Sequence, residues 1–241
     1  YSLKTPTGKN PLFNGASEFK IKSYLEYLAG LEYAADNFKN NVSQIHILKG
    51  KNFLLFFDVG SPPKKSNSSK YQSGPLSFEF FFNNRKIITN CGFGSKISKK
   101  AELISRLTSA QSTLCLNDTS VTRFERSTII NNTFGTSTIS SFRVFDFNTS
   151  EDIESISVSA KHDAYKNNFN YIHKRTMKVN KKNGTLSGVD NLISDTNSKE
   201  LVNNYSIRFH LYPGINAIQT IGKNSILISI EKNKSLIFTA I

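Results

Sequence analysis

Short segments in which apolar and polar residues alternate recur along most of this chain, and they constrain its fold more than any other feature. Residues 76–82 place Leu or Phe at every second position, and residues 205–212 and 226–230 alternate in the same way. Successive side chains of a strand point to opposite faces of a sheet, so this pattern predicts strands that bury one face. We expect about 12–15 short strands after residue 43.

The order of these segments excludes a parallel α/β fold, because no helical segments alternate with the strands. A large antiparallel β-sandwich lets many short strands bury their apolar faces together. Asn183-Gly184 lies between two alternating segments and predicts a type I′ hairpin. The predicted fold class is therefore all-β, mainly a large multi-strand antiparallel β-sandwich, with one N-terminal helix.

Residues 17–35 are the one long segment with helical periodicity, and Ser17 is a candidate N-cap. A weaker helical pattern covers residues 100–108. We divide the chain into residues 1–40, a loop and the helix, and residues 41–241, the sandwich. The apolar stripe of the first helix consists of Ile21, Tyr24, Leu25, Leu28, Leu31 and Ala35.

The charge of the chain favours a polyanionic partner. It has 31 Lys and Arg against 18 Asp and Glu, a formal net charge of +13, which suits nucleic acid, anionic lipid or acidic polysaccharide. The lysines are scattered and no nucleic-acid-binding motif is present, so we expect no nucleic acid. No run of about 18 apolar residues occurs, so we expect no membrane insertion.

No catalytic or cofactor motif is complete in the sequence. The four histidines form no HxH or HExxH pair, and Cys91 and Cys115 form no CxxC motif. A GxSxG nucleophile elbow and a complete phosphate loop are also missing, so we expect no cofactor. The two cysteines could pair or stay reduced, and Cys91 is expected to be a small buried hydrophobe. The chain starts at Tyr1 without a leader, which suggests a piece of a longer protein.

Several polar residues have both a structural and a functional interpretation. His162 precedes Asp163, which is typical of a hydrogen-bonded turn but also compatible with a catalytic pair. Arg208 and His210 share one face of a predicted strand, and that face either meets solvent or lines a groove. Glu79 points away from the Phe stripe of its strand, as a solvated carboxylate would.

Eight short sequence stretches occur along the chain in an order that is informative about its family. They are PLFNGA (11–16), LLFFDVGSPP (54–63), SGPLSFEF (73–80), IITNCG (87–92), SAQSTLCLNDTS (109–120), AKHDAYKNNFNYIHKRTMKV (160–179), GTLSGVDNL (184–192) and IRFHLYPGI (207–215). This series resembles the C-terminal β domain of the heparinase II/III-like polysaccharide lyases. The resemblance runs from about residue 11 to the C-terminus.

The resemblance implies an α/α toroid followed by a sandwich, so residues 1–40 would be the tail of a missing toroid domain or its connector. It also implies β-elimination on acidic, uronic-acid-containing polysaccharide. That reaction needs donors that neutralise the substrate carboxylate, a Tyr or His that removes the C5 proton, and an acid that protonates the C4 leaving oxygen. The substrates of the family imply a location in the cell envelope or periplasm.

Carried over by position, the resemblance places Lys70 and Gln72 at two histidine positions, Asn90 at an aspartate position and Gln111 at a third histidine position. The last three positions hold a structural metal in typical members. Amide oxygens are poor zinc ligands, so we predict no metal here and expect the amides to hydrogen-bond to one another. Lys70 could clamp a substrate carboxylate.

The candidate catalytic residues are Lys70, His162 and His210, and the candidate substrate-binding residues are Lys70, Gln72, Arg208 and His210. The leading hypothesis is the C-terminal domain of a heparinase II/III-like lyase that is inactive without its toroid. The alternative is a non-catalytic carbohydrate-binding or assembly module, which the amides at positions 72 and 111 favour.

Overall fold

The computed structural model describes the 241-residue chain except for residues 34–36, 128–130, 132–134, 195–201, 203 and 232–233. Strands dominate the described residues, and the pairings between them are antiparallel. The all-β prediction is confirmed, and the described strands, β1 to β15, agree with the expected number. No helix in this part of the chain is long and apolar enough to cross a bilayer.

The first layer is a six-stranded sheet in the order β1-β2-β3-β4-β5-β12. Its strands are β1 (Asn41–Val42), β2 (Ile45–Lys49), β3 (Phe53–Asp58), β4 (Phe78–Phe82), β5 (Arg85–Thr89) and β12 (His210–Leu211). The predicted alternation is present, because Phe78 and Phe80 lie in the main core while Phe81 packs on the opposite face. Both faces of this sheet are therefore covered.

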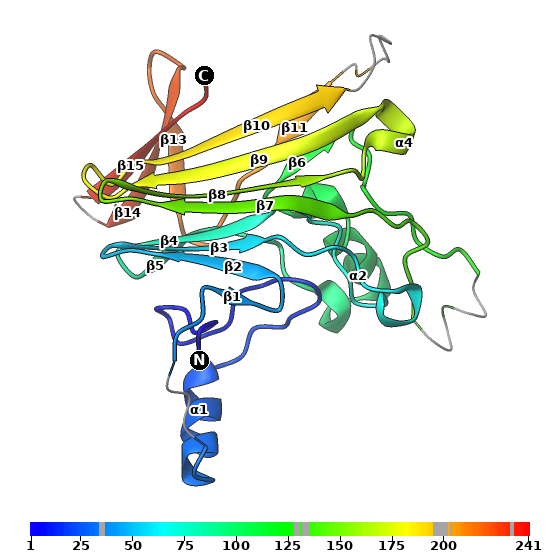
Figure 1. The fold of residues 1–241 in the computed structure, drawn as a ribbon, viewed down its shortest axis with the longest axis horizontal. Coiled ribbons are helices and arrows are strands. Elements are labelled where there is room, and N and C mark those ends of the chain that lie inside the picture. The colour runs from blue at the N-terminus through cyan, green and yellow to red at the C-terminus, as the bar shows by residue number, and fades with distance from the viewer. Residues whose placement is uncertain (34–36, 128–130, 132–134, 195–201, 203, 232–233) are drawn as a thin grey trace.

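The second layer is a four-stranded sheet in the order β10-β9-β8-β7, which lies over the first sheet (Figure 1). Its strands are β7 (Val144–Glu151), β8 (Ser155–His162), β9 (Tyr171–Asn180) and β10 (Leu186–Ser194). A three-stranded sheet of β13 (Asn216–Gln219), β14 (Ser225–Glu231) and β15 (Lys234–Thr239) lies at one end of the sandwich. The pair β6 (Leu114–Leu116) and β11 (Tyr205–Ile207) completes the strands.

The main core joins all three larger sheets. Phe57 from the first sheet, Val158 and Met177 from the second, and Ile228 and Ile230 from the third belong to one buried cluster. Burying side chains of this size is the dominant favourable contribution to folding, at roughly 1.5–3 kcal/mol for each one. The sandwich therefore depends on inward-facing residues from distant parts of the chain.

A second cluster covers the outer face of the first sheet. Phe13 from the N-terminal segment packs there with Ile47, Leu54, Phe56 and Phe81. The leading residues of the chain are therefore part of the sandwich core, although the sequence indicated only a loop.

The N-terminal helix α1 (Ile21–Gly30) is shorter than the predicted helix over residues 17–35. Ser17 is not its cap, because Lys20 holds the N-cap position and makes no side-chain cap bond. The helix starts late because the Ile21 N–H donates to the Gly8 carbonyl at 2.9 Å and residues 9 and 20 form a β-bridge. Ala35 lies outside the described residues.

Among the described residues, the apolar stripe of α1 is covered only in part. Figure 1 shows α1 projecting away from the sheets, and Ile21 is the buried residue of the helix. Tyr24 and Tyr27 are 56% and 65% exposed. The helical periodicity thus predicted the helix but not its environment.

The other helices are short. The predicted helix over residues 100–108 is α2 (Lys99–Ser105), which Ser98 caps by accepting from the Ala101 N–H at 3.0 Å. It ends earlier than predicted because Leu107 is extended. The remaining helices whose bounds the described residues give are α4 (Lys166–Phe169) and the 3₁₀ turns η1 (Lys65–Asn67), η2 (Gly94–Lys96) and η3 (Thr108–Ala110).

Two local predictions require correction. Residues 205–212 do not form one strand, because β11 pairs with β6 whereas β12 pairs with β5. The hairpin at Asn183-Gly184 exists between β9 and β10, but it is not a type I′ turn. That turn needs positive φ at both central residues, and of the two only Gly184 has it, at +70°.

Candidate functional site

Three loops meet at the end of the six-stranded sheet where β4 begins and β5 ends. Gln72 lies in the loop that enters β4, Asn90 directly follows β5, and Gln111 directly follows η3. All three amides are buried. We call these residues, together with Ser112 and His210, the amide cluster.

Gln72 and Gln111 donate to the same backbone oxygen. The Gln72 Nε2 donates to the carbonyls of Ser105 and Gly92 at 2.9 and 2.6 Å, and its Oε1 accepts from the Gly15 N–H at 2.9 Å. The Gln111 Nε2 donates to the Ser105 carbonyl at 2.8 Å. Ser105 ends α2, and terminal carbonyls of a helix lack partners within the helix. The amides therefore bond to the backbone, where we expected bonds to one another.

Asn90 is held in the same way. Its Oδ1 accepts from the Ser112 N–H at 2.9 Å, and its Nδ2 donates to the Leu12 carbonyl at 3.3 Å. The Ser112 hydroxyl in turn donates to the Thr89 carbonyl at 2.7 Å. Asn90 thus connects the end of β5, the loop before β6 and the N-terminal segment.

His210 lies at the edge of this cluster on β12, opposite Thr89 of β5. Its N–H donates to the Ser112 hydroxyl at 3.0 Å, and its Nε2 is 3.0 Å from the Ser109 carbonyl. A carbonyl only accepts, so Nε2 carries the proton and Nδ1 keeps a lone pair. Burial lowers the pKa of His210. This half-buried imidazole is therefore neutral near pH 7 and suited to accept a proton at Nδ1.

Lys70 lies beside the amide cluster and is exposed. The N-terminal segment passes directly against it, because a Cβ placed on Gly15 would lie 2.5 Å from the Lys70 Cβ. The ammonium group of a lysine here could reach an anion at the rim of the cluster. The structure places Lys70, Gln72 and His210 at one end of the sheet.

Arg208 does not join this group. Its Nη2 donates to the Asp118 carboxylate at 2.9 Å and its Nη1 donates to the Ser206 hydroxyl at 2.6 Å. The expected common strand face with His210 is wrong, since the chain changes sheets between Ile207 and His210.

His162 belongs to a separate buried network in the second sheet. Its Nε2 is 3.0 Å from Nδ1 of His173, the residue directly opposite it on β9. The His173 Nε2 is 2.6 Å from Oδ1 of Asp190, and Arg175 donates to both oxygens of Asp190 at 2.7 and 3.0 Å. Asp163 instead accepts from the Arg143 N–H at 2.7 Å. The sequence neighbours His162 and Asp163 therefore do not form a catalytic pair.

The hydrogen bonds of this network fix its protonation. The Ala164 N–H donates to Nδ1 of His162 at 3.3 Å, so His162 carries its proton on Nε2 and donates to His173. His173 then donates from its own Nε2 to Asp190. Burial lowers the pKa of both histidines. Burial alone would raise the pKa of Asp190, but His173 and Arg175 outweigh it and hold this pKa below its usual range.

Sequence reasoning missed His173, Arg175 and Asp190. A signal was present, because His173 and Arg175 occupy the same strand face as Met177 and Val179, and all four are buried. A guanidinium on an apolar strand face requires an anionic partner. The alternation does not indicate which of the carboxylates in the chain supplies it.

Glu79 also differs from the expectation of a solvated carboxylate. It is fully buried, 2.8 Å from the Lys86 ammonium, and accepts from the Thr89 hydroxyl at 2.9 Å. Both faces of β4 are covered, so the face that appeared to meet solvent lies under other residues. Cys91 is exposed, where we expected a buried side chain, and both Cys91 and Cys115 are free thiols.

The sequence of residues 35–240 matches the family model described as Heparinase II/III-like, C-terminal. The chain belongs to this family. The match covers most of the chain, and the resemblance drawn from the ordered stretches is confirmed.

Solved structures of heparinase-type lyases share the fold. The heparan sulfate lyase HepC from Pedobacter heparinus superposes with a TM-score of 0.73 at 15% identity, over 98% of this chain and 37% of that chain. A crystal structure of heparinase III gives a TM-score of 0.67 at 15% identity, over 98% of this chain and 39% of that chain. This heparinase II/III-like chain thus spans under two fifths of the length of either protein. The curated proteins contain no match to it.

The residues of this heparinase II/III-like domain do not fit the metal that the resemblance implied. Gln72, Asn90 and Gln111 supply neutral amides, and the hydrogen bonds above engage each of them with the backbone. Within the described residues, no group of three or more His, Cys, Asp or Glu could hold a metal ion. Zinc prefers thiolate, imidazole and carboxylate ligands, so the donor set here disfavours it.

Proposed function

We propose that this chain is the sandwich domain of a lyase that cleaves acidic, uronic-acid-containing polysaccharide by β-elimination. The family match over residues 35–240 carries the proposal. The solved neighbours are a heparan sulfate lyase and a heparinase III. The net charge of +13 is also suited to attract a polyanion.

In this proposal the catalytic cleft needs an α/α toroid domain of the same protein, which supplies the remaining acid–base groups. The sandwich contributes His210, whose Nδ1 can accept or return a proton, and Lys70, whose ammonium neutralises a substrate carboxylate. The reaction needs a base, an acid and a group that neutralises the substrate carboxylate, and His210 and Lys70 together do not supply all three. The 241-residue chain alone is therefore expected to be inactive.

The test compares the full-length protein with the 241-residue chain on heparan sulfate and other uronic-acid polysaccharides. Product is detected by the ultraviolet absorbance of the unsaturated uronate. We expect product from the full-length protein only, and His210→Gln should lower its kcat by about a hundredfold or more. Arg208→Gln is the matched control, because its guanidinium is bonded to Asp118. Product from the 241-residue chain alone would contradict the proposal that catalysis needs groups from the toroid domain.

A second candidate function is a non-catalytic carbohydrate-binding or assembly module. The observation that favours it is the use of Gln72, Asn90 and Gln111 as structural links to the backbone. Full-length protein that binds the polysaccharide but releases no unsaturated product would support this candidate over the lyase.

We also propose a location in the cell envelope or periplasm, where acidic polysaccharides would be accessible to such a lyase. Fractionation of the source cells, with immunodetection of the protein, tests it. Recovery in the cytoplasmic fraction alone would contradict it.

A further inference from the structure

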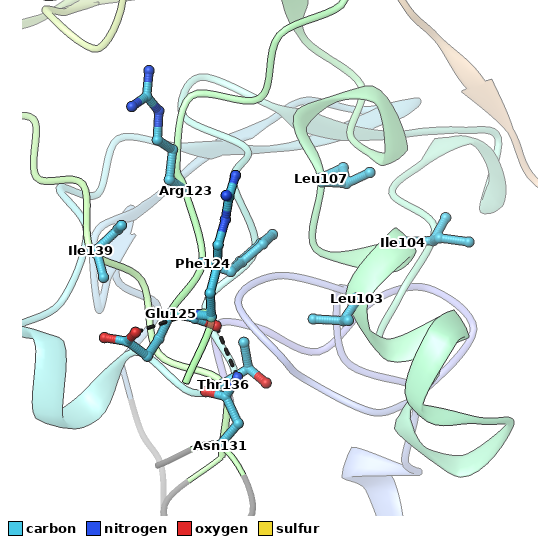
Figure 2. Close-up of a pocket in the computed structure, with 10 residues that line it drawn as sticks. Leu103, Ile104, Leu107, Arg123, Phe124, Glu125, Asn131, Thr136 and Ile139 are labelled. Carbon is cyan, nitrogen blue, oxygen red and sulfur yellow. Dashed lines mark hydrogen bonds between the residues drawn. The ribbon is translucent and has the colours of Figure 1, made fainter. Parts of the chain in front are cut away.

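A pocket lies between α2 and residues 123–126, and Thr136 and Ile139 also line it. Its volume is about 620 Å³. Five of its ten lining residues are apolar, and Figure 2 shows Phe124 facing the side on which Leu103, Ile104 and Leu107 lie. Ile104 and Leu103 are 52% and 39% exposed. Pockets of a few hundred cubic ångströms with mainly apolar walls are typical of small-molecule sites.

The wall formed by Phe124 is built into the fold. Phe124 pairs with Thr138 in an antiparallel bridge, and the Ile139 N–H donates to the Arg123 carbonyl at 2.9 Å. The guanidinium of Arg106 lies 4.5 Å from the centre of the Phe124 ring.

Arg106 fixes this wall from behind. It is fully buried and donates to the carbonyls of Tyr71, Ser68 and Thr136 at 2.8, 2.8 and 2.6 Å. Two of these bonds go to the loop that contains Ser68 and Tyr71, and the third goes to the segment at Thr136, so one side chain holds the two segments together. The pocket is therefore preformed, which reduces the entropy cost of binding a ligand.

Two guanidinium groups stand at the pocket without acidic partners. Arg123 and Arg126 both line it and are exposed, and within the described residues no ion pair engages either side chain. The carboxylate of the pocket, Glu125, is paired with Lys65 at 3.0 Å. The unpaired charge at the pocket is therefore positive.

We propose that this pocket binds an amphiphilic anion, with its apolar body between Phe124 and the side chains of Leu103, Ile104 and Leu107 and its anionic group on Arg123 and Arg126. A carbohydrate fits the apolar side of the pocket less well, because hydroxyl groups placed against Leu, Ile and Phe would lose water without gaining hydrogen bonds. Guanidinium groups suit carboxylate, sulfate and phosphate equally. The site is independent of the proposed lyase function.

The probe is dodecanoate, measured by calorimetry and by displacement of a fluorescent anilinonaphthalene sulfonate from the 241-residue chain. We expect saturable binding of dodecanoate and much weaker binding of the uncharged dodecanol. The double variant Arg123→Gln, Arg126→Gln should weaken dodecanoate binding by roughly tenfold or more. Ile104→Glu, which puts a carboxylate into the apolar wall, should abolish it.

Arg85→Gln is the matched control, since Arg85 is an exposed arginine on β5 and does not line the pocket. Thermal unfolding checks that each variant is folded. Dodecanoate binding that is unchanged in Ile104→Glu and in the double variant would overturn the proposal, and so would equally tight binding of dodecanol.

Anionic phosphatidylglycerol vesicles distinguish the source of the anion. Sedimentation of the chain with these vesicles that is lost in Ile104→Glu supports the pocket and assigns the anion to a lipid headgroup. Dodecanoate binding without vesicle binding supports it and assigns a free amphiphile. Vesicle binding that survives Ile104→Glu, without dodecanoate binding, would overturn it.

Discussion

At the scale of single residues, the ionisable side chains inside the sandwich act as structural links. Asp190 joins β10 to His173 and Arg175 of β9. Arg175 also donates to the carbonyls of Leu76 and Ser112 at 2.9 and 3.0 Å. The buried Arg175 guanidinium thereby links the second sheet to the loops around the amide cluster.

Replacing Asp190 should therefore be strongly destabilising. Asp190→Asn leaves the buried Arg175 guanidinium without a counter-charge, which typically costs about 3–5 kcal/mol. Urea unfolding followed by circular dichroism measures this loss. Asp146→Asn is the control, because Asp146 is exposed and pairs with Lys161 at 2.8 Å, where a loss of about 0–1 kcal/mol is expected. Equal effects of the two substitutions would contradict the role of the network.

The buried titratable groups also predict how stability depends on pH. All four histidines have lowered pKa values when folded, so just below their ordinary pKa of 6.5 the unfolded state binds more protons at each of them. Burial raises the pKa of Asp58 to about 7, so between about pH 4 and 7 the folded state binds one more proton there. The four histidines outnumber this one carboxyl, so the net difference favours proton binding by the unfolded state.

Stability should therefore fall as the pH is lowered through the range just below 6.5. Asp58→Asn removes the opposing contribution and should steepen this fall by up to about 1.4 kcal/mol per pH unit. Asn14, which donates to Asp58 at 3.3 Å, can turn its amide to pair with the new side chain. Urea unfolding at a series of pH values measures both slopes, and identical slopes would refute this assignment.

At the scale of elements, the N-terminal segment behaves as part of the sandwich. It bonds to the loop before β4 through Gly15 and Gln72 at 2.9 Å, and to the end of β3 through Asn14 and Asp58. Gly15 has a φ of +82° and lies directly against the Lys70 backbone. Only a residue without a Cβ fits this position.

Gly15→Ala should destabilise the chain more than Gly184→Ala. Both glycines have positive φ, at +82° and +70°, but a Cβ on Gly184 would meet no atom within 4 Å. Alanine at positive φ costs a similar free energy at both positions, so this cost cancels when the two variants are compared. The remaining difference in unfolding free energy, roughly 1–3 kcal/mol, comes from the steric conflict with Lys70. The difference between the two unfolding free energies tests this. Equal losses would show that the N-terminal segment can move aside freely.

At the scale of the whole molecule, a sandwich boundary at residue 41 leaves out part of the core. Phe13 is 8% exposed and covers the outer face of the first sheet. The helix α1, in contrast, adds little burial to this chain. The proposed toroid would offer a surface for its exposed tyrosines.

A chain that starts at residue 41 should accordingly be less stable and more prone to aggregate than the 241-residue chain. Phe13→Ala isolates the main contact, and substitutions of this kind cost about 3–5 kcal/mol when the side chain is fully buried. Tyr27→Ala on α1 is the control, because Tyr27 is 65% exposed. Unfolding midpoints and light scattering measure both effects. If the chain that starts at residue 41 were as stable as the 241-residue chain, the sandwich domain would begin at residue 41.

The sequence by itself determined the class of the fold and the family. Alternation at period two specifies strands and their buried faces, as in residues 76–82, and the ordered stretches indicated the family that the comparison then matched. These signals are local, since each depends on residues a few positions apart or on order along the chain.

Only the tertiary structure decided the partners of the polar residues. His162 meets His173 because the register of β8 and β9 places them opposite each other, and Asp190 reaches both His173 and Arg175 from a third strand. Glu79 is buried because a second apolar cluster covers its face of the sheet. A period of two separates the faces of a strand, but it specifies neither the neighbouring strand nor what covers each face.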